Sequence, residues 1–293
     1  MNKQLRVLKK IWLLNFLRRT YSASNYFNRK YWQIFKWGFS SKEDTNYTYD
    51  LTPSNILYLA KTIAVVTNSD YKEALGYINE IQNDAALKKS IMETIAGSPQ
   101  KRYADNEVRF GRRLGWYAFA RILKPAIIVE TGVDKGLGSV VLCAALLRNK
   151  QEGYDGRYYG TDINPNAGYF LNGKYKEVGQ ILYGDSITTL SGFTDNIDLF
   201  INDSDHSAEY EYREYQTIKN RITEKTVILG DNSSITDKLA IFSNEAGRDF
   251  IYFQEVPSNH WYPGSGIGIS FNKYPVTIAA SRVYAAENAV LND

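Results

Sequence analysis

A glycine-rich turn between an apolar run and an apolar helix is the feature that most constrains the fold of this 293-residue chain. The apolar run 126–128 leads into Gly132, Gly136 and Gly138, and a second apolar stretch follows over 140–147. A buried strand, a tight turn and a helix in this order form a ligand-binding crevice at the carboxyl end of a strand. Glycine lets the backbone approach a ligand closely there. A plain connection remains an alternative, and the glycine spacing matches neither the phosphate loop nor the dinucleotide fingerprint.

Polar residues follow four further predicted strands. They stand after the apolar runs 157–161, 178–183, 197–201 and 226–229, as Asp162, Asp185-Ser186, Asp203 and Asp231-Asn232. Strands of a parallel, doubly wound sheet share one carboxyl edge, where ligands bind. One acid in such a position often caps the next helix. Its recurrence after successive strands favours a binding site.

The order and spacing of these motifs resemble those of class I S-adenosylmethionine (SAM)-dependent methyltransferases, over about residues 105–272. The resemblance implies an α/β fold with a doubly wound, seven-stranded, mostly parallel sheet of the Rossmann-like methyltransferase type, in which the last strand is antiparallel. The aromatic and β-branched segments 249–254 and 266–271 fit the two final strands. The implied cofactor is SAM.

The same resemblance implies a role for each cofactor residue. Gly132 and Gly136 would face the methionine part of SAM, Asp162 would bind the ribose hydroxyls, and Asp185 with Ser186 would lie beside the adenine. Glu130 would orient the amino-acid end through water. The full set of expected cofactor-binding residues is Glu130, Gly132, Gly136, Ser139, Asp162, Asp185, Ser186 and Asp203.

Asp203, Asp231 and Asn232 would place three oxygen ligands at two neighbouring strand tips. This arrangement is similar to the magnesium site of the catechol and caffeoyl-CoA O-methyltransferases. We therefore predict magnesium or another divalent cation, which could orient an acceptor hydroxyl and lower its pKa. The pair Asp231-Asn232 could instead form a simple turn.

His206 stands three residues after Asp203, close to where those metal-dependent enzymes have a lysine. The run 203–207 looks more like the D-G-D-H-S form of bacterial members of the superfamily, including those linked to sugar and antibiotic tailoring. A neutral imidazole can take a proton near neutral pH. We predict that Asp203 and His206 are catalytic, with His206 as general base; a surface or helix-capping histidine is the alternative.

The loop 255–265 between the last two predicted strands is polar and aromatic, and it contains His260, Trp261 and Tyr262. Aromatic rings can stack on a pyranose, and polar side chains can hydrogen-bond to it, so we predict these three residues as substrate contacts. The predicted activity is O-methylation of a hydroxyl on a small polar acceptor, with a sugar or glycoconjugate precursor favoured. Two alternatives are a metal-independent N- or carboxyl-methyltransferase and a non-catalytic binding protein with a cofactor-type fold.

Residues 1–41 carry nine Lys or Arg and no acid, while the rest of the chain has 26 basic against 32 acidic residues. This asymmetry suggests an anionic partner for the N-terminal segment. Its apolar stretch 11–17 is too short to span a bilayer. One hypothesis is peripheral membrane contact through an amphipathic helix; the other is packing on the body or formation of a homo-oligomer. The acidic body argues against a nucleic-acid partner.

We predict three regions: the basic, aromatic segment 1–41, an accessory helical region 42–104, and a methyltransferase domain 105–293. Helix-period apolar positions predict helices over 55–67, 71–82, 85–95, 106–123 and 279–291. The single cysteine, Cys143, excludes an intramolecular disulfide, and its apolar surroundings predict a packing role. A reducing, cytoplasmic location follows, with any membrane contact at the inner face.

Overall fold

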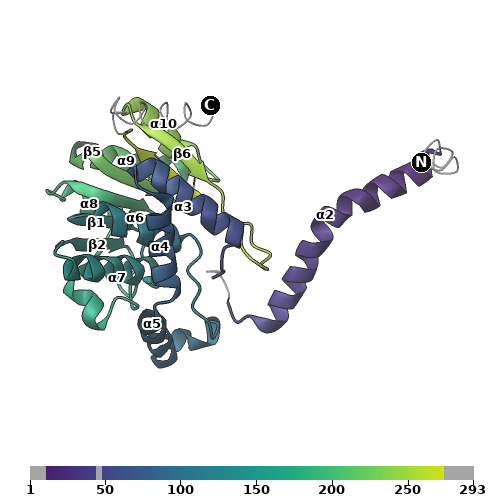
Figure 1. Ribbon diagram of the computed structural model, residues 1–293, viewed down its shortest axis with the longest axis horizontal. Coiled ribbons are helices and arrows are strands. Elements are labelled where there is room, and N and C mark those ends of the chain that lie inside the picture. The colour runs from purple at the N-terminus through teal and green to yellow at the C-terminus, as the bar shows by residue number, and fades with distance from the viewer. Residues whose placement is uncertain (1–10, 44–47, 232, 274–293) are drawn as a thin grey trace, which may run out of the picture.

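Seven strands form one sheet, in the order β3-β2-β1-β4-β5-β7-β6 (Figure 1). The computed structural model describes residues 11–43, 48–231 and 233–273. The strands are β1 Ile127–Thr131, β2 Arg157–Asp162, β3 Gly179–Tyr183, β4 Ile197–Asn202, β5 Ile222–Gly230, β6 Asp249–Phe253 and β7 Ile267–Phe271. Every strand predicted from the sequence is present.

Strands β1 to β5 are parallel, and β7 runs antiparallel between β5 and β6. This is the sheet that the resemblance implies, with its antiparallel closing strand. From β1 the chain adds strands on one side of the sheet, and from β4 it adds them on the other side. The connections after β1 and β4 therefore leave the sheet on opposite faces, and a crevice opens between the carboxyl ends of these two strands. At that point Thr131 lies beside Thr161 of β2 and Asn202 of β4.

Helices cover both faces of the sheet (Figure 1). They are α3 Pro53–Thr67, α4 Tyr71–Gln82, α5 Ala85–Gly97, α6 Arg113–Leu123, α7 Leu137–Gln151, α8 Ser186–Ser191, α9 Ala208–Ile218 and α10 Lys238–Glu245, with 3-10 turns at Pro99–Tyr103, Gly173–Glu177 and Lys219–Arg221. A further helix, α2 Trp12–Ser40, stands apart from the sheet. Helix α6 packs against α7, α4 and α3, and α9 packs against α8 and α10.

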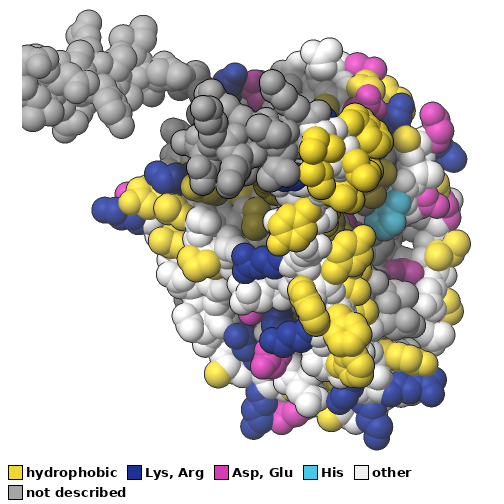
Figure 2. Space-filling view, turned by 90° about the vertical axis from the view of Figure 1, so that its right-hand side faces the viewer, with side chains coloured by type: hydrophobic (Ala, Val, Ile, Leu, Met, Phe, Trp, Pro, Cys, Tyr) yellow, Lys and Arg dark blue, Asp and Glu magenta, His cyan; other side chains and the backbone are white. Residues whose placement is uncertain are grey.

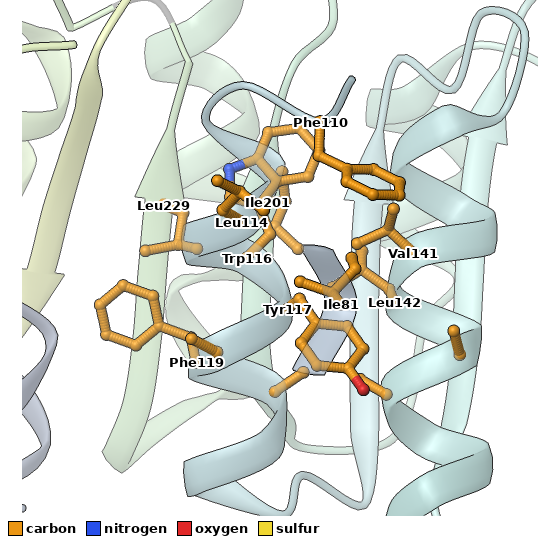
Figure 3. Close-up of a cluster of buried hydrophobic side chains, with 14 of the residues drawn as sticks. Ile81, Phe110, Leu114, Trp116, Tyr117, Phe119, Val141, Leu142, Ile201 and Leu229 are labelled. Carbon is orange, nitrogen blue, oxygen red and sulfur yellow. The ribbon is translucent and has the colours of Figure 1, made fainter. Parts of the chain in front are cut away.

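Successive residues of β4 enter two separate cores. Ile201 belongs to the core that includes residues of α3, α4, α6 and α7, whereas Phe200 packs with Tyr215 of α9 and Phe242 of α10. Figure 3 shows part of the first core, in which Trp116 of α6 lies near Ile201. Full burial of each such side chain contributes about 1.5–3 kcal/mol. The continuous apolar run of β4 is explained by this burial on both faces.

The accessory helices agree with the sequence prediction. Helices α3, α4 and α5 begin after Thr52, Asp70 and Asp84, and each of these side chains accepts a hydrogen bond from a backbone N–H of the first turn. Such caps satisfy donors that the helix itself leaves unpaired. Their apolar faces join the same core as α6 and the sheet. Cys143 is buried in α7, as predicted.

The helix predicted over 106–123 begins later, at Arg113. Gly111 has a φ of +52°, and its N–H donates to the carbonyl of Tyr49 over 3.0 Å. This left-handed backbone cannot continue a right-handed helix. The correction has a functional consequence, because it leaves Arg112 and Arg113 at the amino end of α6. The predicted helix 279–291 lies outside the described residues.

Helix α2 is 29 residues long and has no buried residue. It projects away from the rest of the molecule (Figure 1). Among the described residues, no helix is long and apolar enough to cross a membrane.

Candidate functional site

A cavity of about 400 Å³ lies at the carboxyl edge of the parallel strands. The β1–α7 turn contributes Gly132, Val133, Asp134 and Lys135 to its wall, and the tips of β4 and β5 contribute Asp203 and Asp231. Residues from the accessory region line it as well: Glu43, Thr48, Ile91, Ile95, Tyr103 and Ala104. The cavity therefore lies between the sheet edge and the N-terminal helices.

The glycine turn packs tightly on the tip of β4. Gly132 has a φ of +76°, and an added Cβ would overlap the carbonyl oxygen of Asp203. The N–H of Asp203 donates to the carbonyl of Thr131 over 2.9 Å. Gly132 is thus required by contact within the chain, and that contact brings Asp203 beside the turn. Gly136, with a φ of +90°, is the N-cap of α7.

Glu130 is buried beneath the turn. Its carboxylate accepts hydrogen bonds from the hydroxyls of Tyr158 and Ser139. Burial raises the pKa of Glu130 to about 7, although Tyr158 and Arg113 act in the opposite direction. Ser139 is fully buried and does not cap α7, contrary to the usual role of serine near a helix start. Gly138 leaves room for the Glu130 carboxylate.

The predicted ribose residue, Asp162, stands at the tip of β2. Its two carboxylate oxygens accept from the N–H groups of Asp134 and Asn164, both over 2.8 Å. Each oxygen retains a second lone pair that could accept from a hydroxyl. The Asp162 carboxylate therefore also fixes the β1–α7 turn through Asp134.

Asp185 caps α8, since its side chain accepts from the N–H of Thr188 over 2.9 Å. The hydroxyl of Tyr210 also donates to Asp185, over 2.7 Å. That hydrogen bond and the cap lower the pKa of Asp185. Ser186 is nearly buried and donates to the carboxylate of Glu214. Both residues stand after β3 as predicted, and neither lines the cavity.

Asp203 and Asp231 meet around an arginine that the sequence reasoning missed. Arg112 Nη2 donates to Asp231 Oδ2 over 2.8 Å and lies 3.7 Å from Asp203 Oδ2. Arg112 Nε also pairs with Asp231, and Arg113 Nη2 lies 4.0 Å from Asp203. Side chains of all four residues are no more than 19% exposed. The only sequence signal was a pair of arginines before an apolar helix, a pattern that also suits an exposed helix start.

The charges in this cluster compensate one another. Burial alone would lower the pKa of Arg112, but Asp231 and Asp203 outweigh it and raise that pKa well above its usual value. Burial, and next the Asp231 carboxylate, raise the pKa of Asp203. Glu255 is also buried nearby, where it accepts from the hydroxyl of Tyr49 and from the N–H of Gly266 over 2.9 Å. Acids and arginines are thus held together with little exposure to solvent.

Of the predicted metal ligands, the structure brings Asp203 and Asp231 together, and Asn232 lies outside the described residues. Within residues 11–43, 48–231 and 233–273, no group of three or more His, Cys, Asp or Glu side chains is arranged to hold a metal ion. The positive charge between the two aspartates is the guanidinium of Arg112.

His206 lines the same cavity as Asp203 and is exposed. It precedes α9, in a turn where Asp205 accepts from the N–H of Ser207 over 2.7 Å. The predicted catalytic pair therefore shares one cavity with the β1–α7 turn.

Only one of the three predicted substrate residues lines the cavity. Tyr262 lines the cavity. His260 is 9% exposed and stacks beside Trp261, and burial lowers its pKa. Trp261 contacts Trp37 of α2, with ring centroids 5.3 Å apart. Neither His260 nor Trp261 lines the cavity.

Comparison with known protein families identifies a methyltransferase domain within the chain. The family model of a methyltransferase domain matches residues 129–233, which run from β1 to the tip of β5. No curated protein matches the sequence.

Solved structures resemble the chain over about two thirds of its length. They include an SAH-bound methyltransferase from Podospora anserina (16% identity, 65% of this chain and 88% of that chain, TM-score 0.46). An O-methyltransferase from Bacillus cereus in complex with SAH is also similar (13%, 63% and 91%, TM-score 0.46). A third is the O-methyltransferase TomG from Streptomyces achromogenes, involved in tomaymycin synthesis, in complex with SAM (16%, 66% and 91%, TM-score 0.47).

The family match covers the strands and turns that build the cavity, and the strand order of the whole sheet agrees with it. Residues 129–233 thus match the family of methyltransferase domains, and the sheet around them has the strand arrangement that the resemblance to class I SAM-dependent methyltransferases implies.

Proposed function

We propose that this protein transfers the methyl group of SAM to a hydroxyl of a small polar acceptor, with a sugar or glycoconjugate precursor as the favoured class. The observation that carries the proposal is the joint lining of one cavity by the glycine turn at Gly132 and by Asp203, His206 and Asp231. Aromatic and charged side chains from the segment before α6 and from the loop after β2 complete the wall, among them Tyr103, Asp105, Glu107, Arg109 and Tyr169. Such a mixed lining suits a polar acceptor.

The residues present fit SAM. The turn after β1 leaves its backbone on the cavity wall, and the Asp162 carboxylate at the next strand tip keeps lone pairs for hydroxyl groups. Gly132 and Gly136 would border the methionine part, and Asp185 with Ser186 would lie toward the adenine. Glu130 and Ser139 would support the turn from below. When bound, SAM supplies an electrophilic methyl group.

His206 would act as general base. Its position on the cavity wall allows it to take the proton of an acceptor hydroxyl as the oxygen attacks. Asp203 lies at the junction of the glycine turn and the aspartate–arginine cluster, where it would position the acceptor. Tyr262 on the opposite loop would contact the acceptor as well, with His260 and Trp261 as support for that loop.

A divalent cation between Asp203 and Asp231 would orient the acceptor hydroxyl. Two buried carboxylates, with Asn232 next in sequence, have the oxygen chemistry that magnesium prefers. In the structure, however, these donors do not fit a cation while Arg112 pairs with both of them. A metal-independent methyltransferase is therefore the second candidate, and Arg112 is the observation that favours it.

An acceptor screen with methyl-labelled SAM tests the proposal. Label should transfer to a hydroxyl-bearing sugar or related compound, and His206→Gln should lower kcat by about 10²–10⁴-fold while SAM binding persists. Asp203→Asn should also lower kcat. The matched control is Asp205→Asn, an exposed acid two residues away that is not on the cavity wall.

Two results would count against the assignment. Label transferred only to amines or carboxylates would contradict O-methylation, and a His206→Gln enzyme within tenfold of the original would remove the histidine as base. The same assay after chelation, with magnesium then restored, separates the two candidates: loss and recovery of activity require the cation, and unchanged activity favours the metal-independent reaction.

A further inference from the structure

Helix α2 has one broad apolar face. At 100° per residue, Phe16, Leu17, Phe27, Tyr31, Phe35 and Phe39 fall within an arc of roughly 140°. Each of these side chains is between 50% and 80% exposed. The same arc also contains Thr20, Ser24 and Asn28. Single exposed apolar residues are ordinary on protein surfaces, but six large apolar side chains on one side of a helix mark an interaction surface.

The remaining side of α2 is basic. It carries Arg18, Arg19, Arg29, Lys30 and Lys36, and the helix contains no acidic residue. Four more Lys or Arg precede it in the sequence, within residues 1–10. Figure 2 looks at the side of the molecule from which α2 projects, where hydrophobic side chains and Lys and Arg side chains lie next to one another.

Helix α2 contacts the body through its basic side. Lys30 Nζ donates to the carbonyl of His260 over 3.0 Å, and Trp37 packs against Trp261. On the helix, Lys30 and Trp37 lie about 20° apart, outside the apolar arc and roughly 110–130° from its centre. The contacts with the body therefore lie beside the apolar arc, whose own side chains stay exposed, so packing on its own domain does not explain the apolar face.

We propose that α2 lies in the surface of an anionic lipid bilayer, with its aromatic face among the acyl chains and its basic side chains at the headgroups. A helix of 29 residues is about 44 Å long, and its polar half excludes a spanning arrangement. The charge of α2 distinguishes a lipid surface from a second copy of the protein as its partner. An apolar face flanked only by positive charge repels a second copy of itself and is attracted to an anionic surface. An apolar face and a basic flank together provide the two signals that stable attachment requires.

Co-sedimentation of the full chain with vesicles tests this proposal without any acceptor or activity. We expect binding to vesicles of phosphatidylcholine mixed with phosphatidylglycerol, much weaker binding to phosphatidylcholine alone, and a decrease at high salt. Phe35→Glu should weaken the partition coefficient at least about tenfold, since it removes a large apolar group from the interface. Since no catalytic step is measured, the result is independent of the proposed methyl transfer.

The matched control is Tyr26→Glu. Tyr26 is 85% exposed and lies nine residues before Phe35, half a turn round the helix. Tyr26→Glu introduces the same charge on the basic side without removing an apolar group from the bilayer, and it should weaken partition only about fivefold, the effect of one charge near the surface. Equal losses for the two variants, equal binding to both vesicle types, or no vesicle binding together with self-association in light scattering would each overturn the proposal. Equal thermal midpoints of all three proteins establish that the body remains folded.

Discussion

Substitution of Arg112 by glutamine removes the one guanidinium that contacts both Asp203 and Asp231. At an effective dielectric constant of about 20, a pair of unit charges about 4 Å apart interacts by about 4 kcal/mol. Removing one partner of a buried pair typically costs about 3–5 kcal/mol, because the other charge stays buried without compensation. We therefore expect Arg112→Gln to lower the free energy of unfolding by about 3–5 kcal/mol at pH 7.

The loss should depend on pH. Burial and Asp231 raise the pKa of Asp203 above its ordinary value of 3.8, so the folded state binds a proton that the unfolded state has released. Stability from this group is therefore lost as pH rises above that value. Without Arg112 the pKa should rise further, and the difference between variant and original should grow from acidic to neutral pH. Urea unfolding of both proteins at several pH values measures this difference in the free energy of unfolding.

Arg109 provides the matched control. It is 30% exposed and pairs with exposed acids, including Asp50 over 3.6 Å, so Arg109→Gln should cost less than about 1 kcal/mol. Arg112→Lys, which keeps the charge, should lie between the two. A loss below about 1 kcal/mol for Arg112→Gln, independent of pH, would refute the idea that Arg112 compensates the aspartates. Magnesium that restores the stability of Arg112→Gln would show that the carboxylates can hold a cation once the guanidinium is gone.

Two further predictions concern the turn. Gly132→Ala should destabilise the protein by several times the roughly 1 kcal/mol expected for Gly153→Ala. Both glycines have a positive φ, but only Gly132 faces the Asp203 carbonyl. Urea unfolding midpoints of the two variants test this, and equal losses of stability would contradict the packing argument. Glu130→Gln should flatten the pH dependence of stability. Because the pKa of Glu130 is raised from 4.5 to about 7, the free energy of unfolding should fall by up to about 3 kcal/mol as pH rises through that range. An unchanged pH profile in the variant would show that Glu130 does not titrate there.

The sheet could be predicted from sequence because its signals are local. Apolar runs buried on both faces predict strands wherever they stand, and the acids that follow them mark one edge. All seven strands were predicted in this way, and the antiparallel direction of β7 was implied by the resemblance to the methyltransferases. Helices α3 to α5 were predicted from their apolar period, and the structure adds their caps at Thr52, Asp70 and Asp84.

The composition of the cavity was harder to predict. The sequence identified Asp203, His206 and Asp231, because each follows a strand. It did not identify Arg112, whose position depends on Gly111 ending the segment before α6 in a left-handed backbone against Tyr49. It also grouped His260 and Trp261 with Tyr262, although only Tyr262 lines the cavity.

By itself, the sequence determined the order of strands and helices, the edge at which the polar residues gather and the basic character of α2. Those properties follow from residue pattern and from the alternation that backbone geometry imposes. Only the tertiary structure decided which charges meet, since Arg112 and Asp231 are 119 positions apart and are joined by packing between α6 and the sheet edge. It also decided that α2 contacts the body through its basic side, because the direction of a helix face depends on what the helix packs against and not on its own periodicity.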